Sequence, residues 1–425
     1  MAAAEQGQGP PSGTTGGGGF FGMLSFRRSA TAVASFDPAQ DDELLALDGL
    51  QSHVADRLAA LLLHAQAAQG PVLSLGFLSK LLDAVASSSD ACFRDILSLA
   101  PVAAALSRPP ADRLAADLLD RAVKTLDVLN SASLTLASLR GAHRAALAAA
   151  SCLLLPAAPC NSRAQFARAR RAIARIIATA DDNSSSSNKS SSHSQGGGGN
   201  STMRALSLSV SRNWSAGRSM NAMAAHLAPP PPPPMQQQAA AGAGCGLGLA
   251  LYTMSSVLVF AMWALVAALP CQDRAFSPPV APPKQAQWAG SMAALQDRIA
   301  DEWKRRDKSR YHGSSSSSSS AINTAGAGGL LAEMQAVERA ARDLNSLLEE
   351  IAESEEEDRS RDEILRERAE ELAAACRALE EGLAPLERQL RAVFHRVVAF
   401  RADLVRSIDN SARTNATAPT QYHSF

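Results

Sequence analysis

Two basic clusters are the residues of this chain best placed to do chemistry. The first lies in FARARRAIARII and the second in EWKRRDKSR. Cations at this density on a helix can bind anionic lipid headgroups or an acidic protein partner. We prefer a solvated bundle face for the first cluster and a lipid contact for the second. The residues concerned are Arg168, Arg170, Arg171 and Arg175 in the first cluster, and Lys304, Arg305, Arg306 and Lys308 in the second.

Two cysteines bracket a long apolar run. Cys245 begins it and Cys271 follows it. Reversible palmitoylation is expected at such positions if the run meets a membrane, and ordinary buried thiols are the alternative. The chain has 6 cysteines but no CxxC pair, which argues against a zinc site and a disulfide framework and favours a reducing, cytosolic setting.

The chain carries none of the common catalytic motifs. A Gly-rich phosphate loop after a strand, HExxH and GxSxG are all missing, and the 8 histidines are scattered. We therefore assign no catalytic, cofactor-binding or metal-binding residue and expect a protein that is not an enzyme. An enzyme of small-molecule signalling is the least favoured alternative. The formal net charge of +0 also gives no reason to expect a nucleic-acid partner.

The apolar run, CGLGLALYTMSSVLVFAMWALVAAL at residues 245–269, holds no charged residue. About 20 apolar residues suffice for a helix to cross a bilayer. A helix that is apolar all round is either embedded in lipid or buried at the centre of a helical bundle. Both alternatives stay open at this point, and the charges flanking the run do not fix a topology.

The remaining patterns are helical. Leu50, Val54, Leu58 and Leu61 recur at spacings of three and four, as expected for one face of a helix. Further helices are expected near 72–88, 90–99, 111–130, 133–155 and 162–180. We divide the chain into a disordered leader (1–36), an N-terminal helical region (37–180), a low-complexity linker with one helix near 204–227 (181–240), the apolar helix (245–269), a basic segment with a Ser linker (270–321), a C-terminal helical region (322–408) and a tail (409–425).

The C-terminal region follows a heptad pattern with a 4,3 spacing. A first seam runs from Leu330 to Ile351, and a second from Leu365 to Leu404. A coiled coil that recruits a partner is one interpretation. The preferred one is an antiparallel bundle of these helices, with Gly382-Leu383-Ala384-Pro385 as a turn, and the acidic block at 349–358 as a solvated loop. We therefore predict an all-α protein of helical bundles with a long central apolar helix, which could be a single transmembrane helix, and disordered Ser/Gly/Pro linkers.

Several long strings of the chain resemble the plant Roh/BYPASS-like family. They include FFGMLSFRR, SRNWSAGRSMNAMAAHLAPP, MWALVA-x-x-PCQDR and EGL-x-PLERQ-x-R-x-VFHR, in that order between about residues 20 and 408. The linkers at 181–200 and 229–240 and the Ser run at 314–320 are longer than the family pattern.

The resemblance implies a protein without known enzymatic activity, cofactor or catalytic residues. Members of the family are linked to exocyst subunits and polarised secretion, and also to control of a root-derived growth signal. We expect a membrane-associated adapter or regulator that binds an exocyst subunit. The alternative is a soluble, cytosolic, all-helical regulator of growth signalling, in which the apolar helix is a bundle core.

Overall fold

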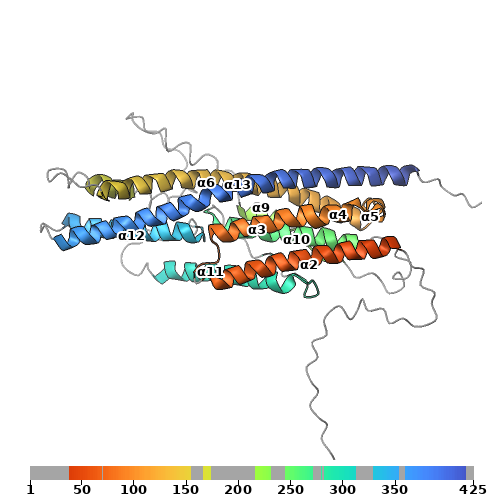
Figure 1. Cartoon of the computed structure of the whole chain (residues 1–425), viewed down its shortest axis with the longest axis horizontal. Helices are drawn as coiled ribbons and strands as arrows, with labels where there is room; N and C mark the ends of the chain where they lie inside the picture. The colour runs from red at the N-terminus through yellow and green to blue at the C-terminus, as the bar shows by residue number, and fades with distance from the viewer. Residues whose placement is uncertain are drawn as a thin grey trace, which may run out of the picture. The chain divides into compact units, whose positions relative to one another are not determined.

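Eleven labelled helical elements, besides a further helical stretch, follow one another in the described part of the chain, which contains no strand (Figure 1). The computed structural model describes residues 38–68, 70–154, 166–173, 216–230, 245–270, 279, 282–312, 329–353 and 359–417. The elements are α2 (Pro38–Ala67), α3 (Leu75–Ser88), the π-helical turn η1 (Ser89–Phe93), α4 (Arg94–Ser98), α5 (Ala100–Ala105), α6 (Ala111–Leu154), α9 (Ala216–Ala224), α10 (Cys245–Ala268), α11 (Ala289–His312), α12 (Ala332–Glu353) and α13 (Arg359–Thr417). Residues 166–173 are helical as well. The all-α prediction is confirmed.

The helices form because apolar residues recur at helical spacing and meet in one core. In α2, Leu50, Val54, Leu58 and Leu61 are all at most 2% exposed. At the start of α3, the Ser74 hydroxyl accepts a hydrogen bond of 3.2 Å from the Phe77 amide, which caps the helix N-terminus. The predicted stripes are therefore the faces that the helices bury.

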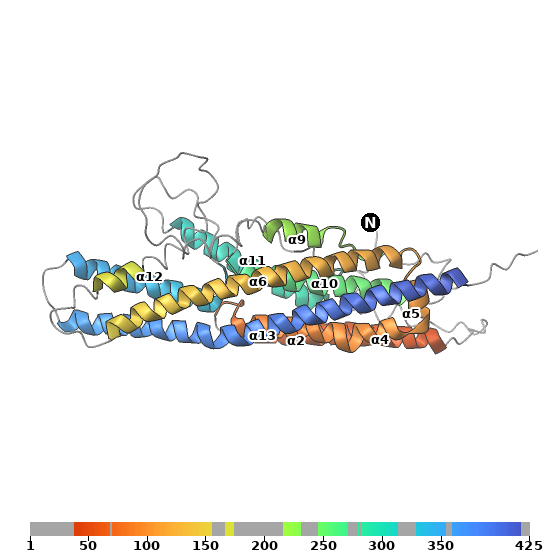
Figure 2. The same ribbon diagram turned by 90° about the horizontal axis from the view of Figure 1, so that it is seen from above.

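The long helices pack side by side. Helix α13 lies along α6, α3 and α12, and α10 lies among α6, α2, α3 and α9 (Figure 2). Helix α11 packs against α2. Residues of all these helices contribute to one continuous hydrophobic core.

Helix α6 differs from our expectation. We predicted separate helices at 111–130 and 133–155, whereas Ala111–Leu154 is a single helix of 44 residues. Ser131 and Ala132, at the predicted break, include neither proline nor glycine, so nothing in the sequence ends the helix there. Gly141 is tolerated inside it.

Helix α13 also contradicts one prediction. The expected turn at Gly382–Pro385 is wrong, because Arg359–Thr417 is one helix of 59 residues with Pro385 inside it. Pro385 and Glu381 both lie on the exposed side of α13, where water can satisfy the carbonyl that loses its amide partner. Gly382 sits where α13 meets α3, and a Cβ there would approach Leu75 Cδ1 to 2.4 Å.

The two heptad seams are used inside the protein. All twelve seam positions from Leu365 to Leu404 are buried, and α12 packs beside α13. The preferred bundle is therefore present only as the packing of α12 beside α13, without the turn at Gly382–Pro385, and the acidic block expected as a loop at 349–358 is helical up to Glu353. The seams are not available as a coiled-coil surface for a partner.

Other predictions fall partly or wholly outside the described residues. The helix expected near 204–227 is seen only as α9 at Ala216–Ala224. The leader at 1–36, the Ser-rich part of the linker at 181–200 and the Ser run at 314–320 lie outside the description. Helix α13 continues to Thr417, into the residues that we had assigned to a tail.

Candidate functional site: the buried apolar helix and the basic segments

Helix α10 is buried along almost its whole length. All residues from 246 to 269 are buried except Leu249, which is half-buried. The segment Gly246–Ala268 is 23 residues long and apolar enough to cross a membrane by length and composition. The helices around it, α2, α3, α6 and α9, take the place that lipid would occupy around a membrane span.

A short polar chain fixes the middle of α10 to α2 and to the start of α11. Gln51 Nε2 donates a hydrogen bond of 2.7 Å to Thr253 Oγ1. The Trp288 indole, which is 0% exposed, donates a bond of 2.8 Å to Gln51 Oε1. Thr253 Oγ1 donates in turn to the Leu249 carbonyl at 2.8 Å. These buried polar atoms are therefore satisfied by one another, as a helix within a protein core requires.

Arg121 of α6 forms a second polar link. The residue is 4% exposed, and its guanidinium donates to the Met223 carbonyl at 3.0 Å, the Ala225 carbonyl at 2.8 Å and Ser255 Oγ at 3.4 Å. Burial lowers the pKa of this guanidinium, and the nearby Asp117 and Asp120 oppose that shift. Carbonyls at the C-terminal end of a helix lack backbone partners, so Arg121 caps α9 while it joins α6, α9 and α10.

The C-terminal end of α10 is held by the segment that leads into α12. The amides of Leu330 and Leu331 donate to the carbonyls of Ala267 and Ala268, each at 3.0 Å. Gly329 packs so closely that a Cβ would lie 2.1 Å from the Ala268 oxygen. Only glycine fits at this position without a backbone shift.

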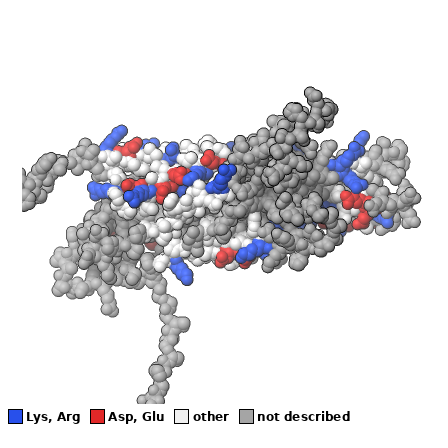
Figure 3. Space-filling view, turned by 180° about the vertical axis from the view of Figure 1, so that it is seen from behind, with Lys and Arg blue, Asp and Glu red and all other residues white. Residues whose placement is uncertain are grey.

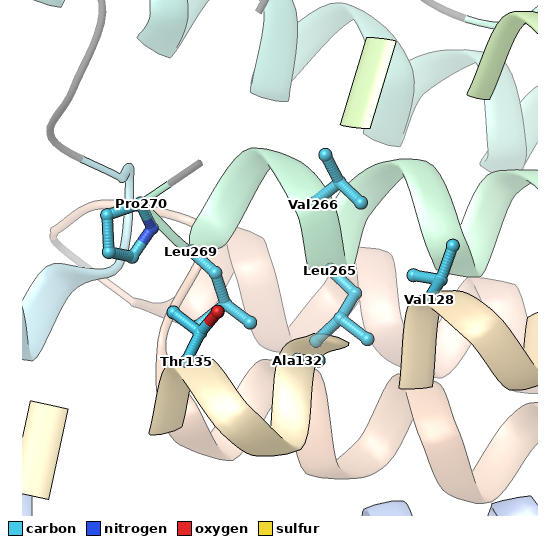
Figure 4. A pocket seen from close by; sticks show the side chains of 7 residues that line it. All are labelled: Val128, Ala132, Thr135, Leu265, Val266, Leu269 and Pro270. Atoms are coloured by element: carbon cyan, nitrogen blue, oxygen red, sulfur yellow. The ribbon is translucent and has the colours of Figure 1, made fainter. Parts of the chain in front are cut away.

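The gap between α6 and α10 is too small for a substrate. Val128, Ala132, Thr135, Leu265, Val266, Leu269 and Pro270 surround a cavity of about 10 Å³ (Figure 4). A single water needs at least that volume, and it also needs polar partners. Thr135, the polar residue of this wall, already donates to the Ser131 carbonyl at 2.9 Å. This interface is therefore packing, not a ligand site.

The first basic cluster lies on an exposed helical turn. Arg168, Arg170 and Arg171 are exposed, and Arg170 pairs with Glu349 at 3.7 Å. This pair joins the basic cluster to the start of the acidic block and fits the solvated-face interpretation. Arg175 lies outside the described residues.

The second basic cluster divides by role. Lys304 and Arg305 are exposed on α11, and Lys304 pairs with Asp301 at 3.2 Å. Arg306 is different, because its guanidinium donates to the Gly329 carbonyl and pairs with Glu338 at 3.1 Å. Its side chain is 17% exposed and joins α11 to α12, and the lipid or partner contact that we expected of Arg306 stays a prediction. Lys308 belongs to α11, but its side chain lies outside the description.

An open groove beside α11 contains the exposed cations. It holds about 610 Å³ and is lined by Ala68, Gly70, Val72, Arg298, Asp301, Lys304 and Arg305. Arg298 is engaged there, because it donates to the Ala65 carbonyl at 2.9 Å. On the face shown in Figure 3, the Lys and Arg side chains lie beside Asp and Glu side chains, so that face carries no large patch of a single sign among the described residues.

The side chains of the two proposed acylation sites lie outside the described part of the chain. Cys245 is the first residue of α10, with its side chain outside the description, and Cys271 lies outside the described residues altogether. Cys376 is fully buried, and burial raises the pKa of its thiol to about 11. Among the described residues, no group of three His, Cys, Asp or Glu side chains could hold a metal ion.

Sequence reasoning missed two carboxylates that fix the start of α3, the buried Glu302 and the half-buried Glu333. Glu302 accepts a hydrogen bond of 2.9 Å from the Val72 amide, and Glu333 accepts one of 3.1 Å from the Leu75 amide. Burial raises the pKa of both carboxyls, and these amide bonds oppose the shift. The partners are more than 200 residues apart in sequence, so no local pattern could have revealed them.

Comparisons with known proteins match the part of the chain whose contacts are described above. The family model described as "Protein ROH1-like" matches residues 12–408, a range that includes every contact described above. Protein ROH1A of Arabidopsis thaliana is 32% identical, over 94% of this chain and 97% of that protein. Protein ROH1D of the same plant is 34% identical, over 78% of this chain and 81% of that protein.

No solved structure matches the chain. The family match covers far more than half of the sequence, and both relatives exceed 30% identity over most of their length. The chain therefore belongs to the ROH1-like family.

Proposed function

We propose that this protein is a non-enzymatic adapter, a helical scaffold that acts by binding other proteins in plant secretion. An exocyst subunit is the proposed partner, following what the family resemblance implies. In this proposal α10 is the core of the scaffold, and the exposed charged faces of the outer helices are its binding surfaces.

The observation that carries the proposal is the enclosure of α10. Its residues are buried by four helices, and Thr253 and Ser255 hydrogen-bond to Gln51 and Arg121 of those helices. Insertion of α10 into a bilayer would strip away this cover and leave Gln51 and Arg121 without their partners. Each buried polar group left unpaired costs about 1–3 kcal/mol, which opposes such a rearrangement.

A membrane-anchored adapter is the competing proposal. The length and composition of Gly246–Ala268 favour it, because 23 apolar residues can span the hydrocarbon layer. The exposed Lys304 and Arg305 would then lie near anionic lipid. In the scaffold proposal, any attachment to a membrane is made through the partner.

Alkaline carbonate extraction of membranes from cells expressing the full chain separates the two proposals. The parent is compared with Val259→Arg/Leu265→Arg, whose positions are 0% and 1% exposed in α10. The matched control is Leu45→Arg/Leu63→Arg, at positions 73% and 65% exposed on α2. We expect the parent and the control in the supernatant, and loss of cooperative melting only in the α10 variant. A parent that stays in the pellet, with the α10 variant released and folded, would establish the membrane anchor instead.

The adapter role has its own test. The full chain is used to capture purified plant exocyst subunits, with the same chain carrying Val259→Arg/Leu265→Arg as the unfolded control. We expect the folded protein to retain at least one subunit and the control to lose it. Failure of the folded chain to bind any subunit would refute the exocyst proposal, whatever the extraction experiment shows.

A further inference from the structure

The face of α13 that points away from the buried seam has its charges divided by sign. Its first half carries five exposed acidic residues, and its second half carries exposed arginines with small apolar residues between them. Arg377 and Asp409 are the exceptions in the two halves. We call this surface the outer face of α13; its charged members are Glu363, Glu367, Glu370, Glu371 and Glu381 in the acidic half, and Arg388, Arg391 and Arg406 in the basic half.

Most of these charges are not used within the described part of the protein. Glu363, Glu367, Glu370 and Glu381 make no ion pair there, and neither do Arg388 and Arg391. Glu371 pairs with Arg368 at 2.8 Å and Arg406 with Asp403 at 2.9 Å, both within α13. Two charges on the sides of α13 pair instead with other elements. Glu387 pairs with Arg140 at 3.1 Å, and Arg396 pairs with Asp90. The segregation is therefore a property of the outer face and not of the contacts inside the bundle.

Two pairs of opposite charge are placed symmetrically about the midpoint between Ala384 and Pro385. Glu381 and Arg388 lie at equal distances along the helix from this midpoint, and so do Glu363 and Arg406. We propose that the outer face of α13 binds the same face of a second copy of this chain, with the two helices antiparallel. Each acidic half then lies along a basic half, with Glu381 opposite Arg388 and Glu363 opposite Arg406 in a two-fold interface.

The size of the face suits such a partner. From residue 363 to 406 the helix extends for ~65 Å at 1.5 Å per residue. A strip about 10 Å wide along that length would bury ~1,300 Å² in total from two copies, which is within the standard range for specific interfaces. The exposed Ala378, Ala384 and Ala392 near the midpoint allow the two helices to approach closely.

The charge pattern also discriminates among partners. An anionic membrane would attract the basic half and repel the acidic half, and a uniformly basic or acidic protein would meet the same conflict. An antiparallel copy satisfies both halves at once. The two Glu–Arg pairs, one near the midpoint and one near the ends, thus favour a second copy over a surface of one sign.

The test is sedimentation of the full chain at micromolar concentrations, with paired charge reversals. Variant A carries Arg388→Glu/Arg406→Glu, and variant B carries Glu363→Arg/Glu381→Arg. Each variant alone places like charges opposite one another at every proposed pair, so its dimer dissociation constant should rise at least about tenfold. An equimolar mixture of A and B restores every attractive pair and should dimerise as tightly as the parent.

Arg113→Glu/Arg339→Glu is the matched control for variant A, because it makes the same change in net charge at exposed sites outside the outer face of α13. It should dimerise like the parent. Raising the salt from about 0.05 to 0.5 M should weaken the parent dimer, because exposed ion pairs are screened. If circular-dichroism melting shows that A or B has not folded, Arg388→Gln and Glu381→Gln replace them.

Several results would overturn the proposal. They are a parent that is monomeric at about 50 μM in low salt, a dimer that neither variant weakens, and a mixture of A and B that does not regain the parent affinity. Binding of the monomeric parent to phosphatidylserine vesicles, lost in variant A, would assign the basic half to a membrane surface instead.

Discussion

Replacing Arg121 with methionine should release α9 from the rest of the protein. Methionine keeps the length of the side chain but removes every donor. The Met223 and Ala225 carbonyls, which accept from Arg121 at 3.0 and 2.8 Å, then lose their partner. Ala225 is exposed and can bind water, whereas Met223 is 0% exposed. One carbonyl therefore stays buried without a donor.

The magnitude follows from these contacts. A hydrogen bond from a charged donor contributes about 1.5–3 kcal/mol, and the longer contact to Ser255 adds little. Removing the charge also ends its desolvation cost, which offsets part of the loss. We expect the free energy of unfolding to fall by about 2–4 kcal/mol, with amide hydrogen exchange in residues 216–225 rising first.

Chemical denaturation and hydrogen-exchange mass spectrometry measure the two effects. Lys124→Met is the control, because Lys124 donates to the Ala222 carbonyl at 3.3 Å and its side chain is 27% exposed. It should cost less than about 1 kcal/mol. A stability of Arg121→Met within about 0.5 kcal/mol of the parent, with unchanged exchange in 216–225, would refute the capping role.

Three further changes probe the core. Phe260→Ala in α10, at a position that is 0% exposed, should lower the free energy of unfolding by about 3–5 kcal/mol. Leu63→Ala, at a position that is 65% exposed, is the control and should lower it by less than about 0.5 kcal/mol. Equal effects of the two changes in denaturant titration would contradict the burial of Phe260. Gly329→Ala should lower the melting temperature, because the added Cβ meets the Ala268 oxygen. Gly141→Ala is the control, because a Cβ there has nothing within 4 Å, and it should raise the free energy of unfolding by up to about 1 kcal/mol. Stabilisation by both changes would argue against the close approach of Gly329 to the Ala268 oxygen. Burial lowers the pKa of His143 below 6.5, so the unfolded chain binds the proton more readily and the stability of the fold falls as the pH drops below 6.5. His143→Gln should lessen that fall in thermal melts between pH 7 and 5. An unchanged dependence of stability on pH would exclude His143 as its source.

Much of the fold could be predicted because apolar spacing survives in the structure. The twelve seam positions of α13 were named from a 4,3 pattern, and all are buried. Proline and glycine were weaker guides. Pro385 did not end α13, because the exposed side of the helix lets water satisfy the freed carbonyl, and Gly382 serves a close contact with Leu75 instead of a turn.

For the basic clusters, the sequence could predict which arginines are exposed but not which arginines bind other helices. Arg168, Arg170 and Arg171 are on the surface, as a basic cluster at helical spacing suggests. Arg306, two positions from Lys304 in the same cluster, turns inward to the Gly329 carbonyl and Glu338. Composition cannot distinguish an exposed arginine from one that turns inward, because the partner of the inward arginine comes from another element and is distant in sequence.

The apolar residues of α10 suit a membrane span and a bundle core equally. The support for our scaffold proposal comes from residues in other helices. Gln51 interrupts the apolar face of α2, and Arg121 lies beside Ala122 on the buried side of α6. A polar side chain on a buried face needs a hydrogen-bond partner. Here Thr253 of α10 accepts from Gln51, and Ser255 of α10 accepts from Arg121. In our proposal, a polar residue that interrupts the apolar stripe of a neighbouring helix, matched by a hydroxyl within an apolar run, is the sequence pattern that favours a protein core for that run.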